Sequence, residues 1–257
     1  MSTAPRVWDS VEAWLRHRAT LSGKSIGVVP TMGALHVGHA ALVDRCRREN
    51  DIAVVTLFVN PTQFNDPKDL ARYPRTFDED LALLAAHGVD DVFAPPQSDL
   101  YPHGYRFRIE SECNTSVMEG ARRPGFLQGV MTVVMKLLNI IRADRAYFGE
   151  KDFQQLRTVN EMAADFFLQT EIIACPTVRT ATGLAESSRN RLLTPAGREH
   201  AAWIHRALTT APTPEAAAAM LAEHGFNVEY VEEHWERRLA AAWLEGIRLI
   251  DNVPAPR

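Results

Sequence analysis

The chain has 257 residues, enough for one large domain or for an ordinary domain with a small partner. Hydrophobic residues make up 46% and charged residues 23%, which excludes a disordered or fibrous chain. The net charge is −4, so the chain has no excess of basic residues of the kind that duplex-binding proteins carry, and we expect no nucleic-acid partner. One local basic pocket could still bind a polyanion.

The sequence contains no pattern typical of a membrane span or a secretory signal. No segment reaches the roughly 18 consecutive apolar residues of a membrane span, and residues 1–25 form an amphipathic start without a basic head and apolar run. The cysteines Cys46, Cys113 and Cys175 are odd in number and form no CxxC pair, so we expect reduced thiols packed in the core. These features predict a cytoplasmic protein with no membrane partner.

Strand and helix patterns alternate through the first two thirds of the chain. Short apolar runs predict strands, and amphipathic or strongly apolar stretches predict helices, with a Pro-rich loop at 60–76. The alternation predicts an open α/β sheet with helices on both faces. The expected strands are 26–29, 52–59, 91–94, 146–148 and 171–174, and the expected helices are 38–50, 77–87, 128–141 and 152–167.

The pattern changes at about 178–190, where we place a domain boundary that separates 1–180 from a smaller α+β domain, 181–257. Within this tail, Ala216–Ala219 and Trp235–Ile250 are typical of helices. Asn227–Val231 is typical of one strand, and Thr210–Pro214 of a linker.

The segment Pro30–His39 follows a predicted strand and opens a predicted helix, where free backbone N–H groups and a partial positive charge favour phosphate. Gly33 and Gly38 permit close approach of a ligand to the backbone. His36 and His39 are three residues apart, so both can face one phosphate, and a charged imidazolium would offset its negative charge. Two ordinary surface histidines are the competing interpretation. Zinc ligation is disfavoured because the spacing is not i+4 and no Glu stands beside the first histidine.

Two further segments carry phosphate-compatible groups. Phe148–Asp152 again follows a strand, with Gly149 for backbone access and Lys151 as a compact cation, although Asp152 also suits a simple helix cap. Ser187–Asn190 offers hydroxyls and a guanidinium, or only a serine-rich turn. Gln63 and Gln155 are neutral groups that donate and accept, which suits a hydroxy acid or an amide.

Several stretches, in this order, resemble the pantoate–β-alanine ligase family. HxGH is shared with nucleotidylyltransferases and class I aminoacyl-tRNA synthetases, whereas GEKDFQQL together with SSRN is far more specific. The stretches are PTMGALHVGH (30–39), FVNPTQF (58–64), YPRT (73–76), MEGARRPG (118–125), GVMTVVMKLLNI (129–140), YFGEKDFQQL (147–156), PTVR (176–179) and GLAESSRNRLL (183–193).

The resemblance implies a Rossmann-like doubly wound parallel sheet in 1–180 that binds ATP and pantoate, a shortened C-terminal lid in 181–257, and a homodimer. It implies that the carboxylate of (R)-pantoate attacks the α-phosphate of ATP, giving pantoyl-adenylate and pyrophosphate. β-Alanine then attacks the acyl carbon, giving pantothenate and AMP. Mg²⁺ would accompany the β- and γ-phosphates.

The resemblance also assigns roles to residues. His39 would be the proton donor, His36 would steady the phosphates, and Lys151 would contact them. Glu79 and Asp80 form an acidic pair near the metal. The implied ATP-binding residues are Met32, Gly33, His36, His39, Gly149, Lys151, Asp152, Val178, Ser187, Ser188 and Arg189, and the implied pantoate-binding residues are Met32, Gln63 and Gln155.

The sequence departs from the family pattern at three places. Phe126-Leu127 stands where the family has His-Phe near the amine entry, Glu186 stands where it has Leu or Met, and the tail after 195 looks short. The first departure keeps open a related ligase that uses another amine or hydroxy acid. A nucleotidylyltransferase is disfavoured because a phosphate acceptor would favour cations over Gln63 and Gln155. A non-enzymatic nucleotide-binding relative is a third alternative, disfavoured by the intact histidines and Lys151.

Overall fold

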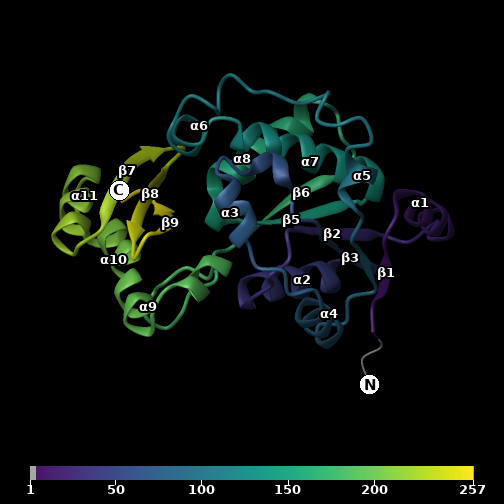
Figure 1. Ribbon diagram of the computed structural model, residues 1–257, viewed down its shortest axis with the longest axis horizontal. Coiled ribbons are helices and arrows are strands. Elements are labelled where there is room, and N and C mark those ends of the chain that lie inside the picture. Colours follow the sequence, from purple (N-terminus) through teal and green to yellow (C-terminus); the bar gives the residue numbers. More distant parts are fainter. Residues whose placement is uncertain (1–3, 257) are drawn as a thin grey trace. The chain divides into compact units, whose positions relative to one another are not determined.

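A parallel six-strand sheet forms the centre of the first part of the chain. The computed structural model describes residues 4–256. All pairings in this sheet are parallel, and the strand order reverses direction between β2 and β5 (Figure 1). In sheet order the strands are β1 (Arg6–Trp8), β4 (Asp91–Phe93), β3 (Ile52–Leu57), β2 (Ile26–Thr31), β5 (Arg145–Gly149) and β6 (Glu171–Cys175). This is the doubly wound arrangement, in which ligands bind where the order reverses.

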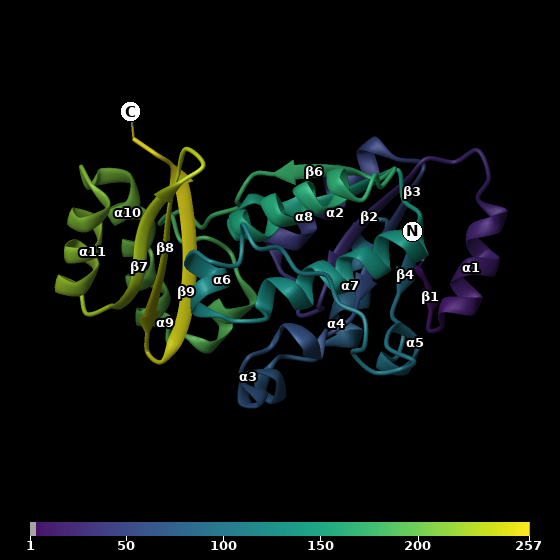
Figure 2. The same cartoon turned by 90° about the horizontal axis from the view of Figure 1, so that it is seen from above.

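Helices cover both faces of this sheet (Figure 1 and Figure 2). One face is packed by α1 (Val11–Thr20), α7 (Phe126–Ile141) and α8 (Phe153–Asp165), whose apolar residues share one core with Val28 and Val54. The other face is packed by α2 (Val37–Glu49) and α4 (Phe77–Ala86), which form a second core with Val29 and Val55. Alternate strand residues point to opposite faces, which is why adjacent valines belong to different cores. Short helices complete the connections: α3 (Pro67–Arg72), α5 (Gln97–Leu100), α6 (Met118–Arg122) and the 3₁₀ turns η1 (Pro61–Gln63), η2 (Glu150–Asp152) and η3 (Ser188–Leu192).

The last part of the chain forms a small antiparallel sheet with its own core. Its strands are β7 (Asn227–His234), β8 (Arg237–Leu244) and β9 (Ile247–Pro254), in that order. Helices α9 (Pro195–Ala201), α10 (Trp203–Thr210) and α11 (Pro214–Glu223) pack with this sheet around a separate hydrophobic core. The α+β character predicted for the tail is therefore confirmed.

The chain divides into two compact units. The first unit comprises residues up to Leu35, His39–Gly149 and Gln154–Cys175, and the second comprises His36–Gly38, Glu150–Phe153 and the chain from Pro176 onward. Two short segments beside β2 and β5 thus make their contacts with the C-terminal part. The functional division into a catalytic domain at 1–180 and a lid at 181–257 stays a prediction.

Four local predictions differ from the structure. Trp235–Ile250 is not a helix but most of the hairpin β8–β9, and Cys113 is exposed rather than packed in the core. Residues 1–25 include the edge strand β1 before α1, and the loop at 60–76 contains α3. In the hairpin, Glu245 and Gly246 both have positive φ, 52° and 74°, the geometry of a two-residue turn that forces the flanking segments to pair.

None of the helices among the described residues is long and apolar enough to cross a membrane.

Candidate active site

Two turns leave adjacent strands at the point where the sheet order reverses. β2 and β5 pair in parallel, with Gly27 opposite Arg145 and Val28 opposite Ala146, so their carboxyl ends lie at the same edge. The segments that follow, His36–Gly38 and Glu150–Phe153, belong to the same compact unit. The two strand-tip turns expected from the sequence therefore come together.

The turn after β2 is held by hydrogen bonds to buried polar groups. The Thr31 hydroxyl donates to the Thr56 carbonyl at 2.6 Å, and the backbone N–H groups of Ala34 and Leu35 donate to the Asp80 carboxylate at 3.0 and 2.7 Å. Gly33 has φ +78°, and a Cβ there would lie 3.0 Å from an Asp80 oxygen, so conformation and space both favour glycine. Asp80, from helix α4, therefore fixes the conformation of this turn.

His36 accepts a hydrogen bond at Nδ1 from the backbone N–H of Gly38, at 3.1 Å. The proton of the neutral ring is then on Nε2, which can donate. Burial, and next the charges of Lys151 and Arg191, lower the pKa of His36 to about 4, against a smaller raising effect of Asp152. His36 is therefore neutral at pH 7 and acts as a hydrogen-bond donor, unlike the imidazolium considered from the sequence.

Glycine at position 38 allows His36 to fold back onto the start of α2. A Cβ on Gly38 would lie 2.8 Å from His36 Cε1 and 3.6 Å from the Cβ of Glu186. The segment with Glu186 thus lies beside His36–Gly38. His39 itself is in the first turn of α2, within the first unit.

Lys151 lies in η2, and only 17% of its side chain is exposed. Its Nζ is 3.9 Å from an Asp152 carboxylate oxygen, a loose ion pair that leaves donors for another anion. A Cβ on Gly149, just before it, would meet nothing within 4 Å, so the backbone at the end of β5 borders open space. These features suit a phosphate site.

The C-terminal segment contributes a short hydrogen-bonded hairpin. The Val178 carbonyl accepts from the Glu186 N–H at 2.9 Å, and the Ser187 hydroxyl accepts from the Arg189 N–H at 3.3 Å, starting η3. Two buried oxygens that sequence reasoning missed, Thr177 Oγ1 and Asn190 Oδ1, have no hydrogen-bond partner among the described residues. Buried unpaired oxygens beside a predicted nucleotide segment are available for a ligand donor.

The predicted pantoate-binding residues Gln63 and Gln155 have hydrogen-bonding groups available, whereas the adjacent Gln154 does not. Gln154 is buried and fully used: it donates to the carbonyls of Asn114 and Val117 and accepts from the Glu119 N–H at 2.9 Å. For Gln155 the structure records no side-chain hydrogen bond within residues 4–256. Gln63 accepts at Oε1 from Asn60 at 3.0 Å, which leaves its amide donors available.

The segments that carry these glutamines are connected within the first unit. Arg123 approaches the Gln63 carbonyl at 3.5 Å and the Glu119 carboxylate at 3.4 Å, and the Glu119 N–H donates to Gln154. The Arg123 guanidinium also lies 3.6 Å above the Phe126 ring. Phe126 is 8% exposed and packs into the core under Arg123, and Leu127 is buried as well.

The acidic pair Glu79–Asp80 does not fit a protein-borne metal site. Both Asp80 oxygens accept backbone hydrogen bonds, while Glu79 is exposed on the same helix. Among residues 4–256, no group of three His, Cys, Asp or Glu side chains is placed to hold a metal ion. Mg²⁺ commonly keeps several waters and binds largely through substrate phosphates, so this chain need not supply such a cage.

A family model and curated relatives with similar sequences point to the same protein family. The family model described as pantoate-beta-alanine ligase matches residues 5–254. A curated pantothenate synthetase of Bdellovibrio bacteriovorus is 50% identical over 253 residues, 98% of this chain and 99% of that protein. One from Legionella pneumophila (strain Corby) is 45% identical over 96% of this chain and 98% of that protein.

Solved structures agree with the sequence relatives. The crystal structure of pantoate-beta-alanine ligase from Francisella tularensis, complexed with beta-gamma ATP and beta-alanine, matches with TM-score 0.93 and 39% identity over 98% of each chain. Pantothenate synthetase from Thermus thermophilus matches with TM-score 0.90 and 40% identity, over 98% of this chain and all of that one. Since these relatives are matched over nearly their whole length, the tail is not short compared with theirs.

Proposed function

The chain belongs to the pantoate-beta-alanine ligase family, and from this membership we propose that it joins (R)-pantoate to β-alanine at the expense of ATP, through a pantoyl-adenylate. The observation that carries the proposal is the convergence of two turns, bearing His36 and Lys151, at the reversal point of the sheet. A solved ligase of the family with TM-score 0.93 is complexed with beta-gamma ATP and beta-alanine, which supports ATP and β-alanine as ligands here.

In the first step, an oxygen of the pantoate carboxylate attacks the α-phosphorus and pyrophosphate leaves. No covalent enzyme intermediate is needed, because the chemistry requires positioning and neutralisation of charge on the phosphoryl oxygens. Lys151 supplies a fixed positive charge, and His36 and His39 supply imidazole donors. Because His36 is held neutral, it contributes a directed N–H rather than a second cation.

In the second step, the β-alanine nitrogen attacks the acyl carbon, AMP leaves with the bonding electrons, and the nitrogen loses a proton. Gln63 and Gln155 hold the pantoyl group, because a neutral amide can bind both a hydroxyl and a carboxylate without adding charge. Their available hydrogen-bonding groups support this assignment. Met32, Gly33, Gly149, Asp152, Val178, Ser187, Ser188 and Arg189 would complete the nucleotide site.

Mg²⁺ would neutralise phosphate charge when it is bound with ATP, and it would be held mainly by the phosphates. The Asp80 contacts argue against the predicted acidic pair as its main ligand. No step of the proposed reaction is therefore assigned to Glu79 or Asp80.

The proposal is tested with the purified enzyme and pantoate carrying ¹⁸O in its carboxylate. We expect pyrophosphate release that requires pantoate, pantothenate formation that requires β-alanine, and one ¹⁸O transferred to AMP. Unlabelled AMP would contradict attack by the carboxylate on the α-phosphate. A dinucleotide product instead of AMP would favour a nucleotidylyltransferase.

The choice of amine is a second, separable question because Phe126 and Leu127 replace the family's usual pair. Both side chains are buried in the core, with Arg123 covering the Phe126 ring. We therefore expect β-alanine to remain the preferred amine. Competition between β-alanine and a panel of ω-amino acids, read out by mass spectrometry of the amides, checks this expectation.

A further inference from the structure

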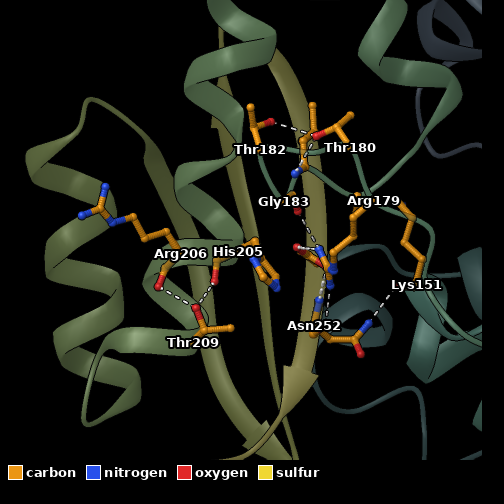
Figure 3. A network of polar contacts seen from close by, with 12 residues as sticks. Lys151, Arg179, Thr180, Thr182, Gly183, His205, Arg206, Thr209 and Asn252 are labelled. Atoms are coloured by element: carbon orange, nitrogen blue, oxygen red, sulfur yellow. Dashed lines mark hydrogen bonds and ion pairs between the residues drawn. The ribbon is translucent and has the colours of Figure 1, made fainter.

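The C-terminal strand β9 reaches the turn that carries Lys151 through one side chain. The Nδ2 amide of Asn252 donates to the backbone carbonyls of both Glu150 and Lys151, each at 2.9 Å. Figure 3 shows Asn252 on this strand with a contact to Lys151. The two residues are 101 positions apart in the sequence, yet both lie within the second compact unit.

Asn252 is itself fixed from the other side. Its Oδ1 accepts from Arg237 Nε at 2.8 Å, and Arg237 also approaches the Glu150 carboxylate at 3.4 Å. The Arg237 guanidinium lies 4.6 Å above the ring of Phe153, the residue that starts α8. Asn252 is only 2% exposed, so water cannot readily take the place of its hydrogen-bond partners. Because its Nδ2 faces two carbonyls and its Oδ1 faces an Arg237 N–H, the amide has one favoured orientation.

The neighbouring residue connects the same strand to the Val178 segment. Asp251 forms a two-fold ion pair with Arg179, at 2.6 and 2.9 Å, and Arg179 also donates to the carbonyls of Asn252 and Gly183. Arg179 follows Val178 directly and forms a β-bridge with Ala185. Consecutive residues of β9 therefore hold both the Lys151 turn and the segment that contains Arg179. Figure 3 shows Asn252 together with Arg179 and Lys151.

We propose that Asn252 is a positioning residue, which fixes the Lys151 ammonium relative to the nucleotide segment that Asp251 holds through Arg179. The inference rests on the proposed function, because it gives Lys151 a role on the phosphates. Asn252 does not touch the reacting atoms. Its amide satisfies two carbonyls of a short 3₁₀ turn, and such a turn has few internal bonds to define its geometry. Misplacement of a charged group by about 1 Å is enough to slow a reaction strongly.

The test is a double-mutant cycle between Asn252 and Lys151, with pyrophosphate release and ATP affinity by calorimetry as readouts. We expect Asn252→Ala to raise the KM for ATP and lower kcat, together on the order of tenfold in kcat/KM, with the KM for β-alanine unchanged. In a Lys151→Ala background the same change should have almost no further effect, since Asn252 acts through Lys151.

Asn252→Asp keeps the volume and the acceptor for Arg237 but turns an oxygen toward the two carbonyls. At about pH 8, where the carboxylate is ionised, we expect it to impair ATP use at least as much as Asn252→Ala does. Asn50→Ala is the matched control: Asn50 is also buried and donates to a carbonyl and a hydroxyl, away from the predicted site residues. It should lower stability and leave the KM for ATP unchanged.

The outcomes separate the two proposals. If Lys151→Ala leaves the rate unchanged, the role of Lys151 in the proposed function is wrong. If Lys151→Ala is impaired but both Asn252 variants keep wild-type kcat and KM, or if the effects of Asn252 and Lys151 are additive, Asn252 does not position Lys151. Equal loss of stability in the Asn252 and Asn50 variants, with an altered KM only in the former, supports positioning.

Discussion

The turns after β2 and β5 lie side by side in the sheet order but are held by opposite chemistry. The turn after β2 presents backbone N–H groups, and the Asp80 carboxylate accepts from two of them. The turn after β5 presents backbone carbonyls, and the Asn252 amide donates to two of them. Each turn is fixed by the kind of group that its own backbone leaves unpaired.

The two braces also differ in origin. Asp80 comes from α4 of the first unit, whereas Asn252 comes from the last strand of the chain. The turn that leads to His36 therefore has its shape set by the α/β core, and the turn with Lys151 has its shape set by the C-terminal sheet. This difference shows that the shape of a predicted phosphate-binding turn can depend on residues that no local pattern includes.

The largest effect is expected from removing the cation of the β5 turn. Lys151→Ala should lower the rate of adenylate formation by roughly 10²–10³-fold, because a fixed charge aimed at the phosphates is lost. Pantoate-dependent pyrophosphate release measures it. Lys24→Ala removes an exposed lysine before β2 and should leave the rate unchanged. Equal rates for both variants would show that the β5 turn does not serve the phosphates.

Breaking the brace of the β2 turn should mainly affect stability. Asp80→Asn places an amide donor or a weaker acceptor against two backbone N–H groups, and we expect a loss of about 2–3 kcal/mol in the free energy of unfolding. Urea unfolding followed by circular dichroism measures the change. Asp78→Asn, on the exposed face of the same helix, should change stability by less than about 0.5 kcal/mol. A stable Asp80→Asn protein would mean that this turn holds its shape without the carboxylate.

Adjacent glutamines after the β5 turn should separate structure from binding. Gln155→Ala should raise the KM for pantoate about tenfold with little change in stability, since its side chain has no partner among the described residues. Gln154→Ala should do the reverse and destabilise the fold by about 1–3 kcal/mol, because three hydrogen bonds are lost. Steady-state kinetics and thermal unfolding on both variants measure this pair of effects. If Gln154→Ala instead raised the KM for pantoate and Gln155→Ala lowered the stability, pantoate binding by Gln155 would be contradicted.

The last expected effect is a pH dependence of the stability, which comes from His36 in the β2 turn. Burial and the nearby cations lower its pKa to about 4 in the folded protein, below the ordinary value of 6.5. Between these values the unfolded chain binds the proton and the folded chain does not, so folding loses stability as the pH falls through that window. His36→Gln should remove this component, and the difference between the two unfolding curves should be flat above pH 6.5. A difference that does not change with pH would contradict a neutral, buried His36.

Much of the α/β core followed from the sequence because each of its elements has a strong local signal. Ile26–Val29 and Ile52–Val59 are continuous apolar, β-branched runs, which suit strands buried on both faces, and the structure contains strands at 26–31 and 52–57. The helix expected at 128–141 begins at Phe126, two residues earlier, because Gly125 with φ +84° ends the preceding turn. The candidate residues at 30–39 and 148–152 lie at the ends of strands β2 and β5, so their place in the fold followed for the same reason.

The C-terminal prediction was wrong where local composition is ambiguous. Arg237–Leu244 is rich in alanine and leucine, which favour helix, but small side chains also allow strand β8 to pack closely under α10. The signal that predicts the hairpin is the Glu245-Gly246 pair between two apolar segments. A helix over Trp235–Ile250 is incompatible with that turn, because Glu245 and Gly246 both have positive φ.

The sequence by itself determined the alternation of strands and helices, the position of the phosphate-compatible turns at strand ends, and the family. These depend on patterns within a few residues, which the chain carries locally. Only the tertiary structure decided the state and the surroundings of the groups: that His36 is neutral, that Asp80 is occupied by backbone N–H groups, that Gln154 is used while Gln155 is available, and that Asn252 meets Lys151. Those properties depend on burial and on partners that lie 35 or more residues away along the chain, and burial and contact exist only once the chain has folded.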